Sequence, residues 1–183
     1  PAVSGVPGIL RQIKTGDTIM VDGREGVIRY NLDPESIAAY RKLEREFFRM
    51  LNRVVEPAVR RGIGSPRFVP GGLIVLETVG FKSGQVRRMP LAATRLHGYV
   101  FISTFRGDRS IWVKNLQKRP RTSFYLNGKK REAKAFVMMP GKRYTKPKSL
   151  PPFIGKITDF LAPYTKAGWA FAVLAPVKSS SDK

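Results

Sequence analysis

Apolar residues first recur at a regular spacing between residues 34 and 61, at Ile37, Tyr40, Leu43, Phe47, Leu51, Val54 and Ala58. A repeat of three or four positions predicts an α-helix with one apolar face. Asp33 suits the N-cap of this helix and Pro34 its first position, while Gly62 ends it. Because the opposite face is rich in arginine and lysine, the helix either packs on a sheet or lies on a membrane surface.

Residues 73 to 138 show shorter apolar runs, separated by turn residues, which is the pattern of β-strands. The predicted strands cover residues 73–79, 88–96 and 98–105 and a hairpin over 121–139. Asn127-Gly128, within that hairpin, is the strongest turn signal in the chain. Residues 80–88 form a predicted turn rich in glycine and basic residues. The sequence therefore predicts a run of antiparallel strands.

Several shorter features flank these strands. Asp22-Gly23 predicts a small hairpin, and a short helix is expected between a cap at Asp108 and a stop at Pro120. Further along, the sequence predicts a short helix over 157–164, a buried strand or helix end over 167–177, and a frayed tail over 178–183.

These elements predict a mainly β fold with flanking helices (α+β), built as a small barrel. A doubly wound parallel sheet is excluded because strands and helices do not alternate. A length of 183 residues predicts a single domain over 1–183. Its expected parts are an N-terminal arm over 1–33, the amphipathic helix over 34–61, the barrel core over 73–139, and a basic loop with the C-terminal segment over 140–183.

The balance of charged residues indicates which kinds of partner the protein binds. Thirty-four Lys and Arg against thirteen Asp and Glu give a formal net charge of +21. A field of this sign attracts polyanions, which could be nucleic acid, acidic lipid head groups, or a phosphorylated and carboxylated cofactor. Nucleic acid is the weakest of these candidates, because no RNA-recognition or helix-turn-helix signature accompanies the charge.

The scarcity of cysteine and histidine narrows the possible chemistry. The chain has no cysteine and one histidine, His97, which is expected in a turn before a strand. A thiolate metal site, a cysteine nucleophile and a Ser-His-Asp triad are therefore not expected, and no metal ligands are predicted. No catalytic residue can be assigned. No apolar run reaches the length of a membrane span and no signal peptide is expected, so the prediction is a cytoplasmic protein.

The segment "VGFKSGQVRRMP" concentrates groups that bind anions. Its two glycines allow a tight turn whose amides can form an anion nest. Lys82 adds a point charge, and Arg87 and Arg88 add forked donors suited to phosphate or carboxylate. In an alternating strand these two arginines face opposite sides, so only one needs to point into a site.

A second basic segment, "STFRGDRSIWVKNL", precedes the short helix. Arg106, Arg109 and Ser110 lie before a helix N-terminus, where free amides and the helix dipole favour anions. The two basic segments are therefore expected to form opposite sides of one groove.

Together these segments resemble the deazaflavin (F420)-dependent nitroreductase family. "LETVGFKSGQVRRMPL" is similar to that family's Thr-x-Gly-Arg-Lys-Ser/Thr-Gly-x-x-Arg-x-x-Pro-Leu segment, with Phe81 in place of its arginine. "DRSIWVKNLQKRP" is similar to its Trp-x-x-Asn-Leu-x-x-x-Pro helix, which the hairpin "TSFYLNGKKREAKA" follows. The resemblance covers about residues 73 to 138. It implies a split β-barrel of the FMN-binding type, shared with flavin and deazaflavin oxidoreductases.

The resemblance also implies a cofactor and its site. Coenzyme F420, with its anionic phosphate and oligoglutamate tail, is the expected cofactor, and FMN is the second candidate. By position, the phosphate and tail would meet Lys82, Ser83, Gln85 and Arg87. The deazaflavin ring would lie near Pro90, Leu91, Thr104, Trp112 and Asn115.

The implied activity is transfer of hydride from reduced F420 to an electron-poor, small hydrophobic acceptor such as a quinone, a nitro compound or an enone. The alternative is a non-catalytic split barrel that binds a lipid or fatty acid. We also expect peripheral contact with anionic lipids at the inner face of the cell membrane. A homodimer is a further expectation.

Overall fold

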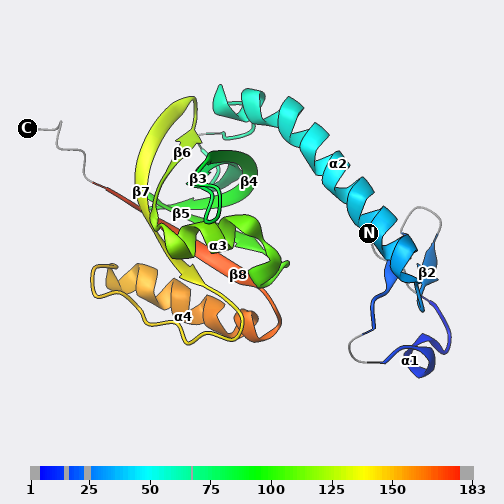
Figure 1. The fold of residues 1–183 in the computed structure, drawn as a ribbon. Helices are drawn as coiled ribbons and strands as arrows, with labels where there is room; N and C mark the ends of the chain where they lie inside the picture. Colours follow the sequence, from blue (N-terminus) through cyan, green and yellow to red (C-terminus); the bar gives the residue numbers. More distant parts are fainter. Residues whose placement is uncertain (1–4, 15–16, 23–25, 67, 178–183) are drawn as a thin grey trace, which may run out of the picture. The chain divides into compact units, whose positions relative to one another are not determined.

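The computed structural model describes residues 5–14, 17–22, 26–66 and 68–177. Its elements in chain order are α1 (Ile9–Gln12), β1 (Met20–Asp22), β2 (Val27–Arg29), α2 (Pro34–Arg60), β3 (Gly71–Val79), β4 (Val86–Leu96), β5 (Tyr99–Thr104), η1 (Gly107–Arg109), α3 (Ile111–Lys118), β6 (Arg121–Leu126), β7 (Lys129–Met138), α4 (Pro152–Lys166) and β8 (Ala170–Pro176) (Figure 1). The chain divides into two compact units, residues 1–50 and 51–183, and α2 runs through both. The single domain over 1–183 stays a prediction.

The first unit holds a small hairpin and most of α2. Strands β1 and β2 pair antiparallel, which confirms the predicted hairpin, although Gly23 of its turn lies outside the described residues. Asp33 caps α2: its Oδ1 accepts a hydrogen bond from the Ser36 amide at 2.8 Å, and its Oδ2 accepts one from the Ser36 hydroxyl at 2.6 Å. These bonds lower the pKa of the Asp33 carboxyl. The predicted start of the helix at Pro34 is confirmed.

The second unit is a closed antiparallel barrel of six strands in the order β3-β4-β5-β8-β7-β6. Two of its hairpins are joined by two-residue turns whose residues have positive φ. These are His97 and Gly98 (φ 47° and 83°) between β4 and β5, and Asn127 and Gly128 (φ 52° and 76°) between β6 and β7. The predicted mainly β fold with flanking helices is confirmed.

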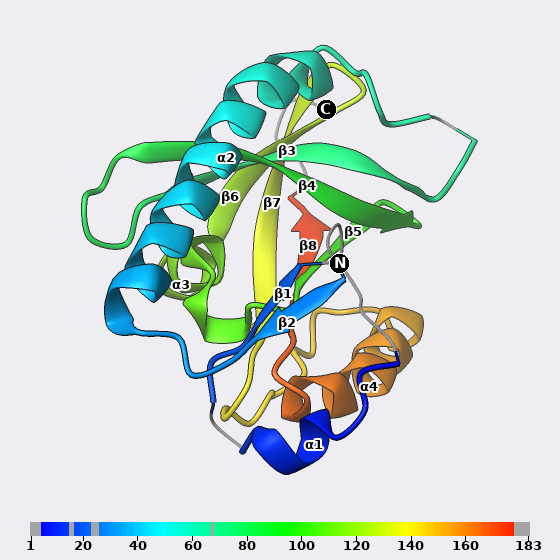
Figure 2. The same ribbon diagram turned by 90° about the vertical axis from the view of Figure 1, so that its right-hand side faces the viewer.

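Alternation along the strands separates the inside of the barrel from its outer face. Leu76, Ile102 and Leu174 point inward and are buried with Trp112 and Leu116 of α3. On the outer face, a second buried cluster is formed by Leu150, Ile154 and Val173, with Phe101 and Phe136 packed against it. Figure 2 shows α4, which carries Ile154, lying along the outside of the barrel. The last turn of α2 also packs outside, since Val59 is buried and the Arg60 guanidinium lies 5.9 Å from the centre of the Tyr125 ring.

The structure corrects several predicted boundaries. The glycine-rich turn is shorter than 80–88, because β4 begins at Val86 and places both arginines in a strand. The N-cap of α3 is Ser110 rather than Asp108, which lies in η1. Helix α4 begins at Pro152, five residues before the predicted helix. The apolar C-terminal run is a strand, β8, which joins the barrel between β5 and β7. The predicted frayed tail, 178–183, lies outside the described residues.

Candidate anion-binding site

Strand β4 carries Arg87 and Arg88 on opposite faces. Arg87 stands across from Thr78 and Arg88 across from Glu77 on β3. Because strand residues alternate, Arg87 shares its face with Met89 and Leu91, which pack against the barrel core. Arg88 is on the outer face. This arrangement confirms that only one of the two arginines points to the inner side of the barrel rim.

Arg88 is occupied by a carboxylate on that outer face. Its Nε lies 2.7 Å from Oε2 of Glu77, whose Oε1 lies 2.6 Å from Lys130 Nζ and 2.9 Å from Ser123 Oγ. Burial raises the pKa of the Glu77 carboxyl, but the bonds from Lys130, Arg88 and Ser123 outweigh it and lower the pKa to about 2. Glu77 therefore stays ionised and neutralises two cations, Arg88 of β4 and Lys130 of β7. Arg87, by contrast, has no ion pair among the described residues.

The turn over residues 80–85 uses most of its own amides. The Gly80 amide donates to Gln85 O at 2.8 Å, the Gly84 amide to Gly80 O at 2.9 Å, and the Gln85 amide to Ser83 Oγ at 3.3 Å. Only the amides of Lys82 and Ser83, at the tip of the turn, have no hydrogen-bond partner among the described residues. The predicted anion nest is therefore limited to these two amides. Residues 82–85 are all exposed. An anion is therefore expected to meet the tip of the turn together with the Lys82 side chain.

Helix α3 is tied directly to this turn. Asn115 is fully buried; its Nδ2 donates to Thr78 Oγ1 and its Oδ1 accepts the Phe81 amide, both at 2.9 Å. Arg119 adds a longer bond from Nη1 to Gly80 O at 3.3 Å. Asn115 thus fixes the turn rather than facing a ligand with a free amide. The start of α3 lies one to two helical turns away, about 7 Å along the axis.

The second predicted basic segment surrounds the start of α3. Thr104 ends β5, and its hydroxyl lies 3.1 Å from that of Ser110 and accepts the Arg106 amide at 3.2 Å. Gly107 fits here because a Cβ would lie 2.5 Å from Gly168 O, and because its φ is +52°. The first turn of α3 contains no acidic residue. Arg106 and Arg109 are exposed at this end, where cations and free helix amides favour an anion.

The remaining predicted residues fall on different sides of the barrel wall. Trp112 is only 4% exposed and forms part of the core. Leu91 packs inward, whereas its neighbour Pro90 faces outward opposite Val75. The two side chains of the Pro90-Leu91 pair therefore lie on opposite faces of β4.

Sequence reasoning missed four residues around this site. Glu77 could have been found from hairpin register, because a six-residue turn at 80–85 places residue 77 opposite residue 88. Arg119 gave no signal. Phe105 and Trp169 lie beside Thr104, where β5 pairs with β8, and their rings are 6.5 Å apart in an edge-to-face arrangement. Both are exposed, Phe105 by 72% and Trp169 by 38%.

Two kinds of feature are absent from the described part of the chain. None of its helices is long and apolar enough to cross a membrane. No group of three or more histidine, cysteine or acidic side chains is placed to hold a metal ion within residues 5–14, 17–22, 26–66 and 68–177.

The six-stranded barrel, the cationic turn and the helix tied to it define a β-barrel protein with a cationic rim. The sequence profile of the F420H(2)-dependent quinone reductase family matches residues 49–149. The chain belongs to this family, and it is therefore an F420H2-dependent oxidoreductase. This confirms the deazaflavin-enzyme resemblance and favours an enzyme over a lipid carrier.

Solved structures show similar chains. An F420-H2-dependent reductase (FDR-A) is 19% identical, with 55% of this chain and 92% of that chain covered and a TM-score of 0.35. A putative pyridoxamine 5'-phosphate oxidase from Listeria innocua is 9% identical, with 58% and 84% covered and a TM-score of 0.39. The heme storage protein HutZ from Vibrio cholerae is 11% identical, with 58% and 82% covered and a TM-score of 0.37. No curated protein matches the chain.

Proposed function

We propose that this enzyme binds F420 by the turn over residues 80–85 and Arg87, and reduces a planar quinone. The observation that carries the cofactor assignment is the contrast between two adjacent arginines. Arg88 is neutralised by Glu77 on the outer face, whereas Arg87, at the inner rim, has no carboxylate partner within the described part of the chain. Lys82 lies at the tip of the preceding turn and adds a second cation for the phosphate and tail.

The donor set of this rim fits F420 and fits FMN less completely. Lys82, Arg87 and the amides of Lys82 and Ser83 offer donors, and residues 78–91 contain no acidic side chain. Several cations spread along a rim suit a long polyanion better than the single phosphate of FMN. When bound, F420H2 supplies the hydride. The chain's own residues hold the anionic part and orient the ring.

An exposed aromatic surface beside Thr104 supports a planar, hydrophobic acceptor. Phe105, Ile111 and Trp169 are exposed by 72%, 63% and 38%, and Trp169 also stacks on Phe171 at 6.0 Å. Large aromatic faces exposed at a loop cluster offer stacking area for a ring, which a quinone presents. The hydroxyls of Thr104 and Ser110 share one hydrogen bond, so one of them can also donate to an acceptor oxygen that gains negative charge.

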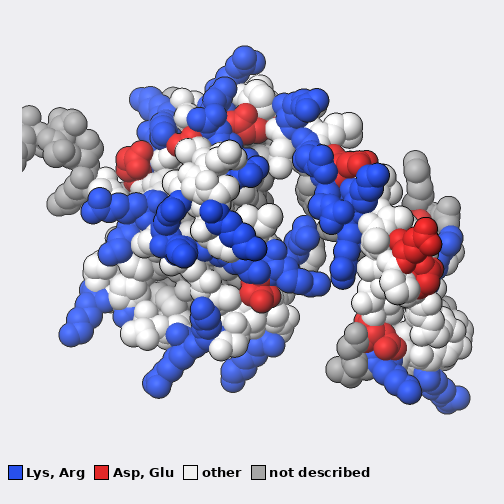
Figure 3. All heavy atoms as spheres, in the orientation of Figure 1, with Lys and Arg blue, Asp and Glu red and all other residues white. Residues whose placement is uncertain are grey.

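Membrane contact, a cytoplasmic location and a homodimer stay predictions. The positive charge is what supports the first of these. Figure 3 shows lysine and arginine spread over the visible face of the barrel unit, with few acidic side chains between them.

The experiment that tests the proposed function is an assay of F420H2 oxidation with menadione as the quinone. Phe105→Ala is expected to raise the KM for menadione about fivefold, because a stacking face is worth about 1 kcal/mol. It should leave the dissociation constant of F420, measured by fluorescence, unchanged. Phe160→Ala is the matched control, since Phe160 is an exposed aromatic residue of α4. Absence of F420H2 oxidation would contradict the proposed function. An equal effect of both variants on the KM would contradict the assignment of the acceptor-binding surface to Phe105.

A further inference from the structure

Half of strand β7 has an open edge. On one side, β6 pairs with residues Lys129–Lys134; on the other, β8 pairs with residues Ala133–Met138. The barrel is closed through the first half of β7, and beyond Ala135 this strand has no strand partner on its β6 side. The position that would face Val137 in the β6 register is Lys118, which belongs to helix α3 instead of a strand.

Two hydrogen bonds show which backbone groups point toward this open edge. The Ala135 amide donates to Pro120 O at 2.7 Å, on the β6 side. The Val177 amide donates to Glu132 O at 3.3 Å, on the β8 side. Because hydrogen-bonding direction alternates in an antiparallel ladder, odd-numbered residues of β7 bond toward β6 and even-numbered residues toward β8. The N–H and C=O of Val137 therefore point away from β8.

These groups lack partners in the described part of the chain. No described residue pairs with the N–H or C=O of Val137. Proline also has no N–H, so Pro120 cannot return a bond to Ala135 O. The edge thus offers one donor between two acceptors, which is the hydrogen-bonding pattern of an unpaired strand.

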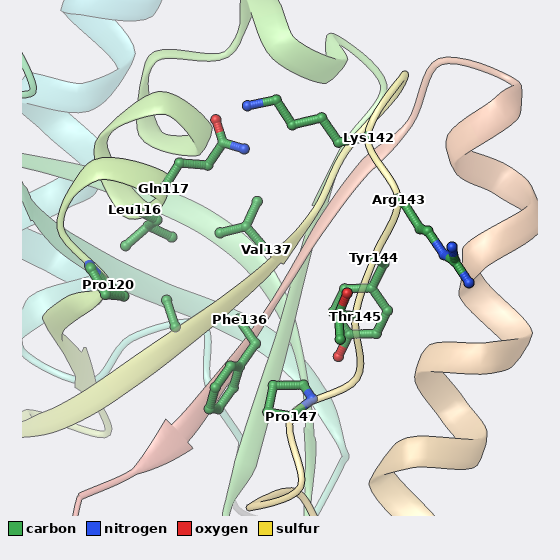
Figure 4. A pocket seen from close by; sticks show the side chains of 11 residues that line it. Leu116, Gln117, Pro120, Phe136, Val137, Lys142, Arg143, Tyr144, Thr145 and Pro147 are labelled. Carbon is green, nitrogen blue, oxygen red and sulfur yellow. The ribbon is translucent and has the colours of Figure 1, made fainter.

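A groove of about 430 Å³ covers this edge, lined by the end of α3, by β7 and by the loop after β7. In Figure 4, Gln117 and Lys142 extend at one end of the groove, and Phe136, Tyr144 and Pro147 lie at the other. Arg143 extends away from Val137, toward α4. Lys142 has no ion pair among the described residues. None of these lining residues belongs to the predicted F420 site.

We propose that this groove binds a small N-acylated amino acid, a ligand with one amide, one carboxylate and an apolar side chain. Its amide oxygen would accept the Val137 N–H, as in a short added strand, and its carboxylate would meet Lys142 Nζ. The apolar side chain would rest among Phe136, Pro120 and Pro147. A single residue fits best, since α3 and Pro120 occupy the places of further strand residues, and the volume is that of a small-molecule site.

The first test uses N-acetyl-L-leucine as the probe and records amide resonances of the isotope-labelled full chain during a titration. The expected result is a saturable shift of the Val137 amide signal. N-acetyl-L-leucinamide lacks the carboxylate, and 4-methylpentanoate lacks the amide. Both should bind about tenfold more weakly, because a charge-assisted or paired hydrogen bond is lost. Absence of a shift at Val137, or equal affinity for all three probes, would overturn the proposal.

A second test compares Lys142→Met with Arg143→Met, two exposed neighbours of equal charge. Lys142→Met should weaken N-acetyl-L-leucine binding about tenfold, while Arg143→Met leaves it unchanged. F420 affinity should be unaltered in both variants, which separates this site from the proposed cofactor site. Equal losses in the two variants would show general attraction by positive charge and would overturn the assignment to this groove.

Discussion

Arg87 and Arg88 are adjacent in sequence and lie in opposite electrostatic environments. Arg88 meets Glu77 on the outer face of the sheet, where Lys130 and Ser123 share the same carboxylate. Arg87 lies on the inner rim and has no ion pair among the described residues. The cations that make up the net charge of +21 therefore differ in their surroundings. Part of this charge is neutralised locally by Glu77, and part, at Arg87, has no carboxylate partner among the described residues.

The same contrast separates Lys130 from Lys82. Lys130 Nζ lies 2.6 Å from Glu77, and this bond raises the pKa of Lys130. Lys82 Nζ lies 5.8 Å from the centre of the Phe81 ring and has no carboxylate partner in the described chain. On the outer face, the cations pair with Glu77 and link neighbouring strands. The rim without an acidic residue is the candidate binding site.

The largest expected effect comes from the side chain that fixes the rim. Asn115→Leu removes the partner of the buried Thr78 hydroxyl and of the half-buried Phe81 amide, so the free energy of unfolding should fall by about 3 kcal/mol. Chemical denaturation measures this loss. Lys114→Leu, at an exposed position of the same helix, is the control. Equal stability of the two variants would show that Asn115 does not anchor the turn.

The two arginines provide the next largest and most direct comparison. Arg87→Met should weaken F420 binding about tenfold to a hundredfold, because a charge-assisted hydrogen bond to an anion contributes about 1.5–3 kcal/mol. Arg88→Met should change F420 affinity little and should lower the free energy of unfolding instead. Fluorescence titration and denaturation of both variants measure the two quantities. If Arg88→Met weakens F420 binding as much as Arg87→Met, the division between the faces is wrong.

Local patterns predicted much of this fold. Helix α2 follows from apolar spacing and the Asp33-Pro34 start, and the β6–β7 hairpin follows from Asn127-Gly128. Alternation also predicted that Arg87 and Arg88 face opposite sides. Each of these depends on residues close in sequence, whose geometry is set by the period of the element.

Features that depend on distant residues could not be predicted in the same way. Strand β8 is an apolar run whose length suits a strand or a helix, and its place between β5 and β7 decides between them. Asn115 was expected near the ring, but its amide is used by Thr78 and Phe81, about 35 residues away in the chain. The network around Glu77 requires the register of three strand pairs. Tertiary contacts determine such roles, and the sequence pattern does not record them.

The smallest expected effect concerns the outer face. The pKa of Glu77 is lowered from 4.5 to about 2, so its ionised form stabilises the fold above about pH 4.5, and this stabilisation is lost as the pH falls toward 2. Glu77→Gln should therefore lower the free energy of unfolding at pH 7 by about 1 kcal/mol, a modest value because Arg88 and Lys130 are 44% and 45% exposed. Denaturation between pH 7 and pH 2.5 should show the difference from wild type shrinking. Glu132→Gln, at an exposed position of β7, is the control. If the difference in the free energy of unfolding stays constant with pH, Glu77 stabilises the fold by packing and not by its charge. The ion pairs with Arg88 and Lys130 would then not contribute to stability.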